Sequence, residues 1–233
     1  MNIGYGAGAI ADYPWHLNGH RPWSLEDDEK AEACLKSLSS LGINYIDTAH
    51  RYGNGRSEDL IGQSVKGEEI KIFTKIELGT TQEMKSKLDL SKQRLGKING
   101  LLLHNPDFSQ TRLLHAASLW LTTLGFEYYG FSTEPAEDAK LYYDIYGLNA
   151  IEFPYSKWDR RAEDSIFPWA KKHFKIINRI RGGPLLGGVP ERGVIEGLRF
   201  ILENSNRIDL ALIGTTNPEH LREVVEILKR EFE

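Results

Sequence analysis

The chain has 233 residues, 40% of them hydrophobic and 27% charged, which is typical of a globular protein with one substantial core. A net charge of −4 and a pI near 6.0 exclude a broadly basic surface, so we expect no nucleic-acid partner. The sequence has neither an apolar run long enough to cross a bilayer nor a basic-then-apolar leader, so we expect no membrane partner and a cytoplasmic location.

Short apolar runs, which we predict to be strands, alternate with segments that we predict to be helices. The first strand covers residues 2–7, and the helix after it is capped by Ser24 and ends at Gly42. Cys34 lies on this helix among leucines at helical spacing, which indicates core packing. Further strands are predicted to begin at residues 43, 70, 98, 126, 148, 174 and 208. Further helices are predicted over 57–67 (beginning at Arg56 or Ser57), 82–96, 111–125, 134–147, 160–173 (with a break near Pro168), 191–205 and 217–233.

This strict alternation predicts a parallel sheet, which can be a closed (β/α)8 barrel or an open doubly wound sheet. The open sheet usually carries a G-x-G-x-x-G turn that leads directly into a helix. Here "GYGAGAIAD" has glycines, but a long loop separates it from the next helix. We therefore predict an α/β protein, a (β/α)8 TIM barrel that forms a single domain over residues 1–233.

Polar residues stand at the carboxyl ends of these strands, where the active sites of such barrels lie. Asp47 and Lys75 end neighbouring strands and should pair, because a buried unpaired charge is costly. Lys75 would then lie near Tyr52 and lower the pKa of its phenol, which makes Tyr52 a candidate proton donor. His104, on the next strand, is a candidate to share that proton or to bind a substrate oxygen. Each group alone also suits a structural role, but their joint occurrence favours catalysis.

Several stretches of the sequence resemble the aldo-keto reductases. They are "GINYIDTAHRYGNGRSEDLIGQSVKG", "KIFTK", "LLLHNPD", "YGFST", "FPYSKWDRR" and "LIGTTNPEHLREVVEIL". The resemblance implies reversible hydride transfer between NADPH or NADH and the carbonyl of a small aldehyde, ketone or sugar-like substrate. It assigns the proton donor to Tyr52, the tuning of its pKa to Lys75 and Asp47, and the orientation of the carbonyl to His104.

The resemblance also implies a set of cofactor-binding residues, and some of them depart from the family pattern. Thr133 stands where asparagine is usual and Glu152 where glutamine is usual, and the charge of Glu152 would favour oxidised nicotinamide. The turn after the last strand lacks the usual basic residues for a 2′-phosphate, so the choice between NADPH and NADH stays open. The implied cofactor-binding residues are Ser132, Thr133, Glu152, Arg179, Gly214, Thr215, Thr216, Asn217 and His220.

Trp15, Trp23 and Trp158 are candidates to contact the substrate, because they lie in predicted loops near the rim. The remaining histidines have no ligand-like spacing, so we expect no metal site. Two other functions stay open: a non-redox acid/base enzyme of the lyase or epimerase type, and a ligand-binding barrel without catalysis. The sequence does not predict the oligomeric state.

Overall fold

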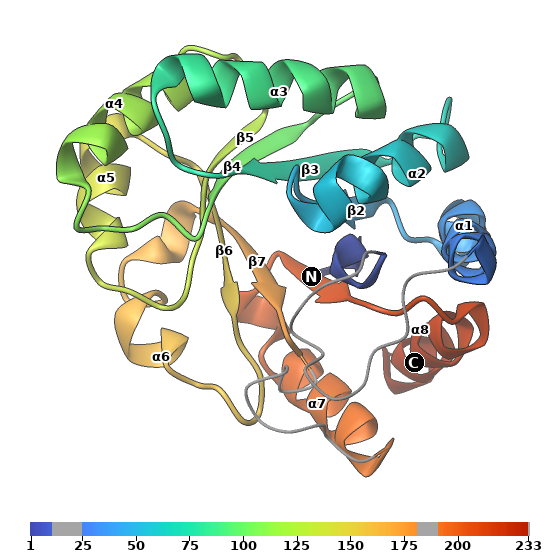
Figure 1. Ribbon diagram of the computed structural model, residues 1–233. Coiled ribbons are helices and arrows are strands. Elements are labelled where there is room, and N and C mark those ends of the chain that lie inside the picture. The colour runs from blue at the N-terminus through green and yellow to red at the C-terminus, as the bar shows by residue number, and fades with distance from the viewer. Residues whose placement is uncertain (11–24, 181–190, 233) are drawn as a thin grey trace, which may run out of the picture.

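The computed structural model describes residues 1–10, 25–180 and 191–232. Within these residues the strands are parallel and pair in chain order, and β1 pairs with β8, so the barrel is closed (Figure 1). The predicted (β/α)8 architecture is therefore confirmed. The strands are β1 (Asn2–Gly6), β2 (Tyr45–Asp47), β3 (Lys71–Ile76), β4 (Gly100–His104), β5 (Tyr128–Ser132), β6 (Ala150–Pro154), β7 (Phe174–Asn178) and β8 (Leu210–Ile213).

Helices surround the strands (Figure 1), and short 3-10 turns join several of the elements. The α-helices are α1 (Leu25–Leu41), α2 (Arg56–Ser64), α3 (Thr81–Leu95), α4 (Thr111–Thr122), α5 (Ala139–Tyr146), α6 (Ala162–Ser165), α7 (Glu191–Glu203) and α8 (Pro218–Phe232). The 3-10 turns are η1 (Ala7–Ala9), η2 (Tyr52–Gly55), η3 (Ala170–Lys172) and η5 (Ser205–Arg207). Local chemistry sets some of the boundaries. Thr80 and Glu83, for example, form a reciprocal capping box that starts α3.

One predicted helix is shorter in the structure than the sequence suggested, and another has the break near Pro168 that was predicted for it. The helix expected over 134–147 begins only at Ala139. Glu134 directly precedes Pro135, which disfavours a helical backbone at Glu134, and the Glu134 side chain binds two arginines at the rim. The helix expected over 160–173 is divided into α6 and η3, with Pro168 between them, since proline lacks the N–H that a continuous helix needs. Ser24, the predicted cap of the first helix, lies outside the described residues.

Apolar side chains fill the part of the barrel interior that lies before the carboxyl ends of the strands. The rings of Phe73 and Phe174 stack there with centroids 6.0 Å apart and an interplanar angle of 9°. Gly100 is required beside them, because a Cβ at this position would lie 2.2 Å from Phe73 Cδ1. The interior cluster comprises Phe73, Leu102, Ala150, Ile176, Leu210 and Leu212, with Tyr45, Tyr128 and Phe174 packed against it.

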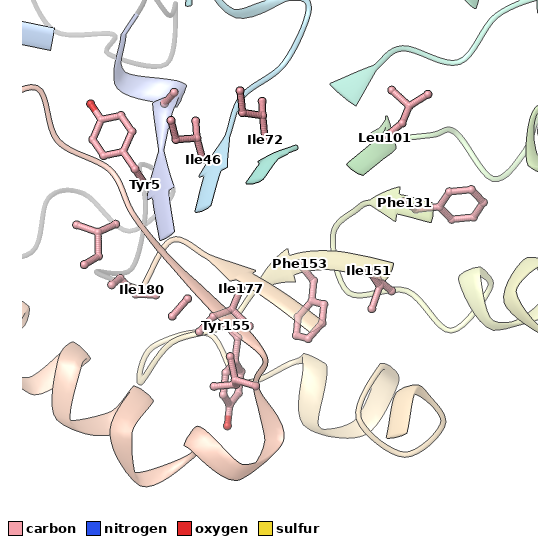
Figure 2. Packing of buried hydrophobic residues seen from close by; sticks show 14 of the residues in the cluster. Tyr5, Ile46, Ile72, Leu101, Phe131, Ile151, Phe153, Tyr155, Ile177 and Ile180 are labelled. Atoms are coloured by element: carbon pink, nitrogen blue, oxygen red, sulfur yellow. The ribbon is translucent and has the colours of Figure 1, made fainter. Parts of the chain in front are cut away.

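The alternate residues of each strand face the helices and form the larger core (Figure 2). Ile46, Leu101 and Phe131 are examples, and each has no exposed surface. Cys34 is also fully buried in this core, which agrees with the packing role predicted for it. Because both faces of the strands are filled, the barrel is a rigid frame, and only the residues at its ends are available for chemistry.

Candidate active site

A layer of polar residues follows the apolar interior at the carboxyl ends of the strands. Side chains alternate along a strand, so a residue two positions beyond an interior residue shares its face. Tyr45 is followed in this way by Asp47, Phe73 by Lys75, Leu102 by His104, Ala150 by Glu152 and Ile176 by Asn178. The alternation that fills the barrel floor thus also delivers the polar groups to one mouth.

Lys75 lies at the centre of this layer, and its side chain is almost fully buried. Its ammonium group donates a hydrogen bond to Asp47 Oδ2 and another, of 2.9 Å, to the Thr48 carbonyl oxygen. Glu152 Oε2 forms an ion pair with the same nitrogen at 3.2 Å. Burial opposes a charge on Lys75, but Asp47 and Glu152 outweigh this effect and raise the pKa of Lys75. The lysine is therefore a fixed positive charge at neutral pH.

Tyr52 is brought to Lys75 by the tight turn η2 that follows β2. Gly53, Asn54 and Gly55 all have positive φ in this turn (56°, 54° and 96°), which glycine adopts without strain. The centroid of the Tyr52 ring lies 5.4 Å from Lys75 Nζ. Gly8 stands beside the phenol, since a Cβ there would be 3.6 Å from Tyr52 Oη.

His104 completes the group of four side chains predicted from the sequence. Its ring meets the ring of Tyr52 edge to face, with centroids 5.7 Å apart at 85°. Burial, followed by the positive charges of Lys75 and Arg51, lowers the pKa of His104 to about 2. The imidazole is therefore neutral at physiological pH, and it can donate one hydrogen bond without carrying a charge.

Glu152, predicted to contact a cofactor, has both of its oxygens directed at protein groups. Oε2 faces Lys75, and Oε1 accepts a hydrogen bond of 2.7 Å from Asn178 Nδ2. Asn178 was not predicted from the sequence, where its neighbour Arg179 was named instead as an implied cofactor-binding residue. The period-two pattern, with Asn178 two residues after the interior Ile176, could have identified it.

Arg179 instead lies at the rim, where it has a φ of 53°. Its guanidinium donates to Glu134 Oε1 at 2.6 Å, and Arg161 donates to the other oxygen of the same carboxylate at 2.8 Å. Ser132 and Thr133, at the end of β5, are both buried. The Thr133 hydroxyl donates to the Glu134 carbonyl oxygen at 3.0 Å, so this side chain helps to hold the rim.

The predicted residues after β8 form the turn into α8. Asn217 Oδ1 accepts hydrogen bonds from the backbone N–H groups of Glu219 and His220, and Thr215 Oγ1 accepts one from the Asn217 N–H. These residues therefore cap the helix, and Thr216 lies between them. Beside the turn is a largely apolar hollow lined by Ile180, Val194, Leu198, Ile213, Gly214, Thr215, His220 and Val224.

Of the three tryptophans predicted to contact the substrate, only Trp158 lies within the described residues; Trp15 and Trp23 do not. Trp158 follows β6 and is 36% exposed. Its ring lies against α7, since a Cβ on Gly197 would be 3.3 Å from it. The side chain therefore stands at the outer rim and not among the four central residues.

Two further features set this mouth apart from the rest of the described structure. Among the described residues, the non-glycine residues with positive φ are Asn54, Asn105 and Arg179, and each follows the carboxyl end of a strand. Most of the buried side-chain atoms without a hydrogen-bond partner also belong to the polar layer, which is unusual where stability alone is at stake. They are Asp47 Oδ1, His104 Nδ1, Glu152 Oε2 and Asn178 Oδ1.

The described residues contain no group of three or more metal-ligating side chains placed to hold a metal ion. Within these described residues, no helix is both long enough and apolar enough to span a membrane.

Comparisons with known proteins agree on one family. The Aldo/keto reductase family model matches residues 2–192. The aldo-keto reductase YhdN of Bacillus subtilis is 25% identical over 219 residues, which cover 84% of this chain and 65% of YhdN. The oxidoreductase YqkF of the same organism is 26% identical over 181 residues, which cover 70% of this chain and 58% of YqkF. The chain thus spans less than two thirds of the length of either relative.

Solved structures share the fold. An aldo-keto reductase of Bacillus halodurans in its holo form superposes with a TM-score of 0.77 and 20% identity, covering 98% of this chain and 86% of that one. An aldo-keto reductase of Klebsiella pneumoniae in complex with NADP and acetate gives a TM-score of 0.76 and 19% identity, covering 97% of this chain and 85% of that one. With a family model that matches most of its length and a barrel of the same form, the chain belongs to the Aldo/keto reductase family.

Proposed function

We propose that the chain catalyses reversible hydride transfer between NADPH or NADH and the carbonyl of a small aldehyde, ketone or sugar-like substrate, with Tyr52 as the general acid and base. The observation that carries this proposal is the position of Lys75. Its buried ammonium touches Asp47 and lies 5.4 Å from the centroid of the Tyr52 ring. A cation that close favours the phenolate and so adapts the phenol to proton transfer.

The residues act on a charge that grows during the reaction. When hydride reaches a carbonyl carbon, the oxygen gains negative charge, and Tyr52 gives its proton to that oxygen. Lys75, held in place by Asp47, stabilises the phenolate left behind. Interactions that strengthen as charge develops lower the barrier more than interactions that bind the ground state equally well.

His104 would orient the substrate. With a pKa of about 2 its imidazole stays neutral, so it offers an N–H to the carbonyl oxygen without competing as an acid. Its ring lies edge to face with Tyr52, with centroids 5.7 Å apart, so the two side chains are neighbours in the mouth where the carbonyl would bind.

The nicotinamide cofactor would supply the hydride, and the structure offers groups that fit its two ends. Ser132, buried at the end of β5, is in register with His104 on β4 and Glu152 on β6 and would bind the nicotinamide end. The hollow beside the β8–α8 turn is lined mainly by apolar side chains, together with Gly214, Thr215 and His220, and the adenine end of the cofactor would bind beside it. His220 is the only titratable residue among those that line this hollow. The lining therefore does not decide between NADPH and NADH, and the proposal covers both cofactors.

Titration with NADPH and with NADH, followed by tryptophan fluorescence, tests the proposal directly. We expect micromolar binding of at least one of them, together with cofactor oxidation when small aldehydes or ketones are added. A folded chain that binds neither cofactor would refute hydride transfer.

A second candidate is acid/base chemistry without nicotinamide, such as a lyase or epimerase reaction on a small molecule. The observation that favours it is the additional carboxylate, Glu152, beside Lys75. In that case small hydroxycarbonyl substrates would be consumed without any cofactor, and Tyr52→Phe would stop the reaction. Dependence of turnover on NADPH or NADH would exclude this candidate.

A further inference from the structure

Lys75 is surrounded by more negative charge than one lysine can neutralise. Asp47 and Glu152 both face its ammonium, and both are nearly as buried as the lysine itself. β2 and β6 lie on opposite sides of β3 in the barrel order, so the two carboxylates approach the lysine from different directions. With both acids ionised, this buried group of three would carry a net charge of −1.

The neighbouring groups that are buried with these three carry no compensating charge. Asn178 donates to Glu152 but is neutral, and His104 is neutral at physiological pH. Arg51 lies on the exposed part of the loop that carries Tyr52. Leaving a charge uncompensated in the interior costs several kcal/mol, and the usual response is for one group to take up or lose a proton. The titratable and charged groups that face the layer are Asp47 from β2, Arg51 and Tyr52 from the following loop, Lys75 from β3, His104 from β4 and Glu152 from β6.

The hydrogen bonds point to the same conclusion. Asp47 Oδ1 is a buried oxygen without a hydrogen-bond partner, and Glu152 Oε2 has its ion pair with Lys75 but no hydrogen bond that meets the usual geometry. Carboxylates only accept hydrogen bonds, and a proton on either group would supply a donor that the pair lacks. Burial and then the charge of Glu152 raise the pKa of Asp47 well above its ordinary value, even though Lys75 acts in the opposite direction.

We propose that Asp47 and Glu152 share one proton around Lys75, and that Glu152 is a positioning residue that sets how strongly Lys75 acts on Tyr52. With the shared proton present, the three groups are neutral overall. This proton leaves at a lower pH than the one at which Tyr52 titrates; the mouth then gains one negative charge, and Tyr52 keeps its own proton to a higher pH than it would without Glu152. The effect on Tyr52 rests on the proposed function, whereas the shared proton does not.

Infrared difference spectroscopy on the chain alone tests for the shared proton, because a neutral carboxylic acid has a C=O stretch distinct from that of a carboxylate. We expect this band in the wild-type chain at neutral pH. It should be lost in both Glu152→Gln and Asp47→Asn, because the single carboxylate that remains beside Lys75 in each variant is ionised. Glu134→Gln, which removes a carboxylate at the rim, should retain the band. Absence of the band from the wild type, or its survival in Glu152→Gln, would overturn the proposal.

The pH dependence of kcat/KM for carbonyl reduction tests the effect on Tyr52. The alkaline limb, where the proton donor is lost, should lie about one pH unit lower in Glu152→Gln than in the wild type. Coincident limbs would overturn the positioning role of Glu152. If no NADPH- or NADH-dependent turnover is found, the proposed function fails, while the infrared result still decides whether the proton is shared.

Discussion

Lys75 shows at the scale of single residues how this site is held together. A buried ammonium is stable only when nearby groups compensate its charge and accept its hydrogen bonds. Asp47 and the Thr48 carbonyl accept them, and Glu152 adds a second negative charge. The same contacts fix the direction of the side chain, so that the lysine ammonium stays within reach of Tyr52 without needing to reorganise during a reaction.

Replacement of Tyr52 by phenylalanine should abolish turnover while leaving the cofactor affinity nearly unchanged. The phenol oxygen is the proposed proton donor, and loss of a general acid typically costs at least about a hundredfold in rate. Steady-state kinetics and fluorescence titration measure the two quantities separately. Tyr146→Phe is a suitable control, since that hydroxyl lies on α5 and contacts His115. A comparable loss of cofactor affinity in Tyr52→Phe would argue against its role as proton donor.

His104 should make the stability of the protein depend on pH. The pKa of its imidazole is lowered from 6.5 to about 2 in the folded state, so below pH 6.5 only the unfolded chain binds the proton. The free energy of unfolding should therefore decrease as the pH falls from 6.5, by up to about 1.4 kcal/mol per unit. Chemical denaturation of wild type and His104→Gln at several pH values measures this, and the variant should show the shallower slope. Equal slopes would contradict it.

The sequence was sufficient to predict that Asp47 and Lys75 would meet, because they end neighbouring strands of one sheet. It did not predict that Glu152 would reach the same lysine. β3 and β6 are not adjacent in the barrel, so their contact depends on how the closed cylinder brings opposite walls together. Such contacts across the interior are set by the closure of the barrel and not by the pattern within any one strand.

At the scale of secondary structure, the repeating apolar runs predicted every strand, while helix lengths were harder to predict. Strand β2 begins at Tyr45, two residues later than expected, and α5 begins at Ala139 rather than at Glu134. In α5 the local sequence explains the later start, because Glu134 precedes Pro135, which disfavours a helical backbone at Glu134. The broken helix around Pro168 was predictable because proline acts locally.

Gly100, at the start of β4, shows how tightly the elements fit. Gly100→Ala should lower the free energy of unfolding by about 1–3 kcal/mol, because the added methyl group would overlap the ring of Phe73. Gly6→Ala in β1 is a matched control, since its Cβ would find the nearest atom at an ordinary 3.5 Å. Denaturant unfolding of both variants measures the difference. Equal stability of the two would show that the barrel floor can repack around the methyl group.

The whole molecule depends on the pairing of its first strand with its last. β1 pairs with β8 from Asn2 and Leu210 to Tyr5 and Ile213, and this ladder closes the cylinder. Closure brings together groups that are far apart in the sequence: Tyr5 Oη donates a hydrogen bond of 2.6 Å to the Thr215 carbonyl oxygen. The turn after β8, where we propose that the adenine end of the cofactor binds, is thus attached to β1, the first strand of the barrel.

Tyr5→Phe should therefore affect both stability and cofactor binding. Tyr5 is fully buried, and the variant keeps its packing but leaves the Thr215 carbonyl without this donor, at a cost of about 1–2 kcal/mol in the free energy of unfolding. Because the turn loses its attachment to β1, NADPH or NADH should also bind more weakly. Tyr143→Phe is a suitable control, since its buried hydroxyl on α5 donates to the Ala150 carbonyl at the same 2.6 Å and also accepts a hydrogen bond from the Phe131 N–H. It should lose at least as much stability as Tyr5→Phe and retain full cofactor affinity, as measured by denaturation and fluorescence titration. Equal losses of affinity in the two variants would mean that the weakening reflects general destabilisation, and an unchanged affinity in Tyr5→Phe would mean that the turn holds its shape without the bond.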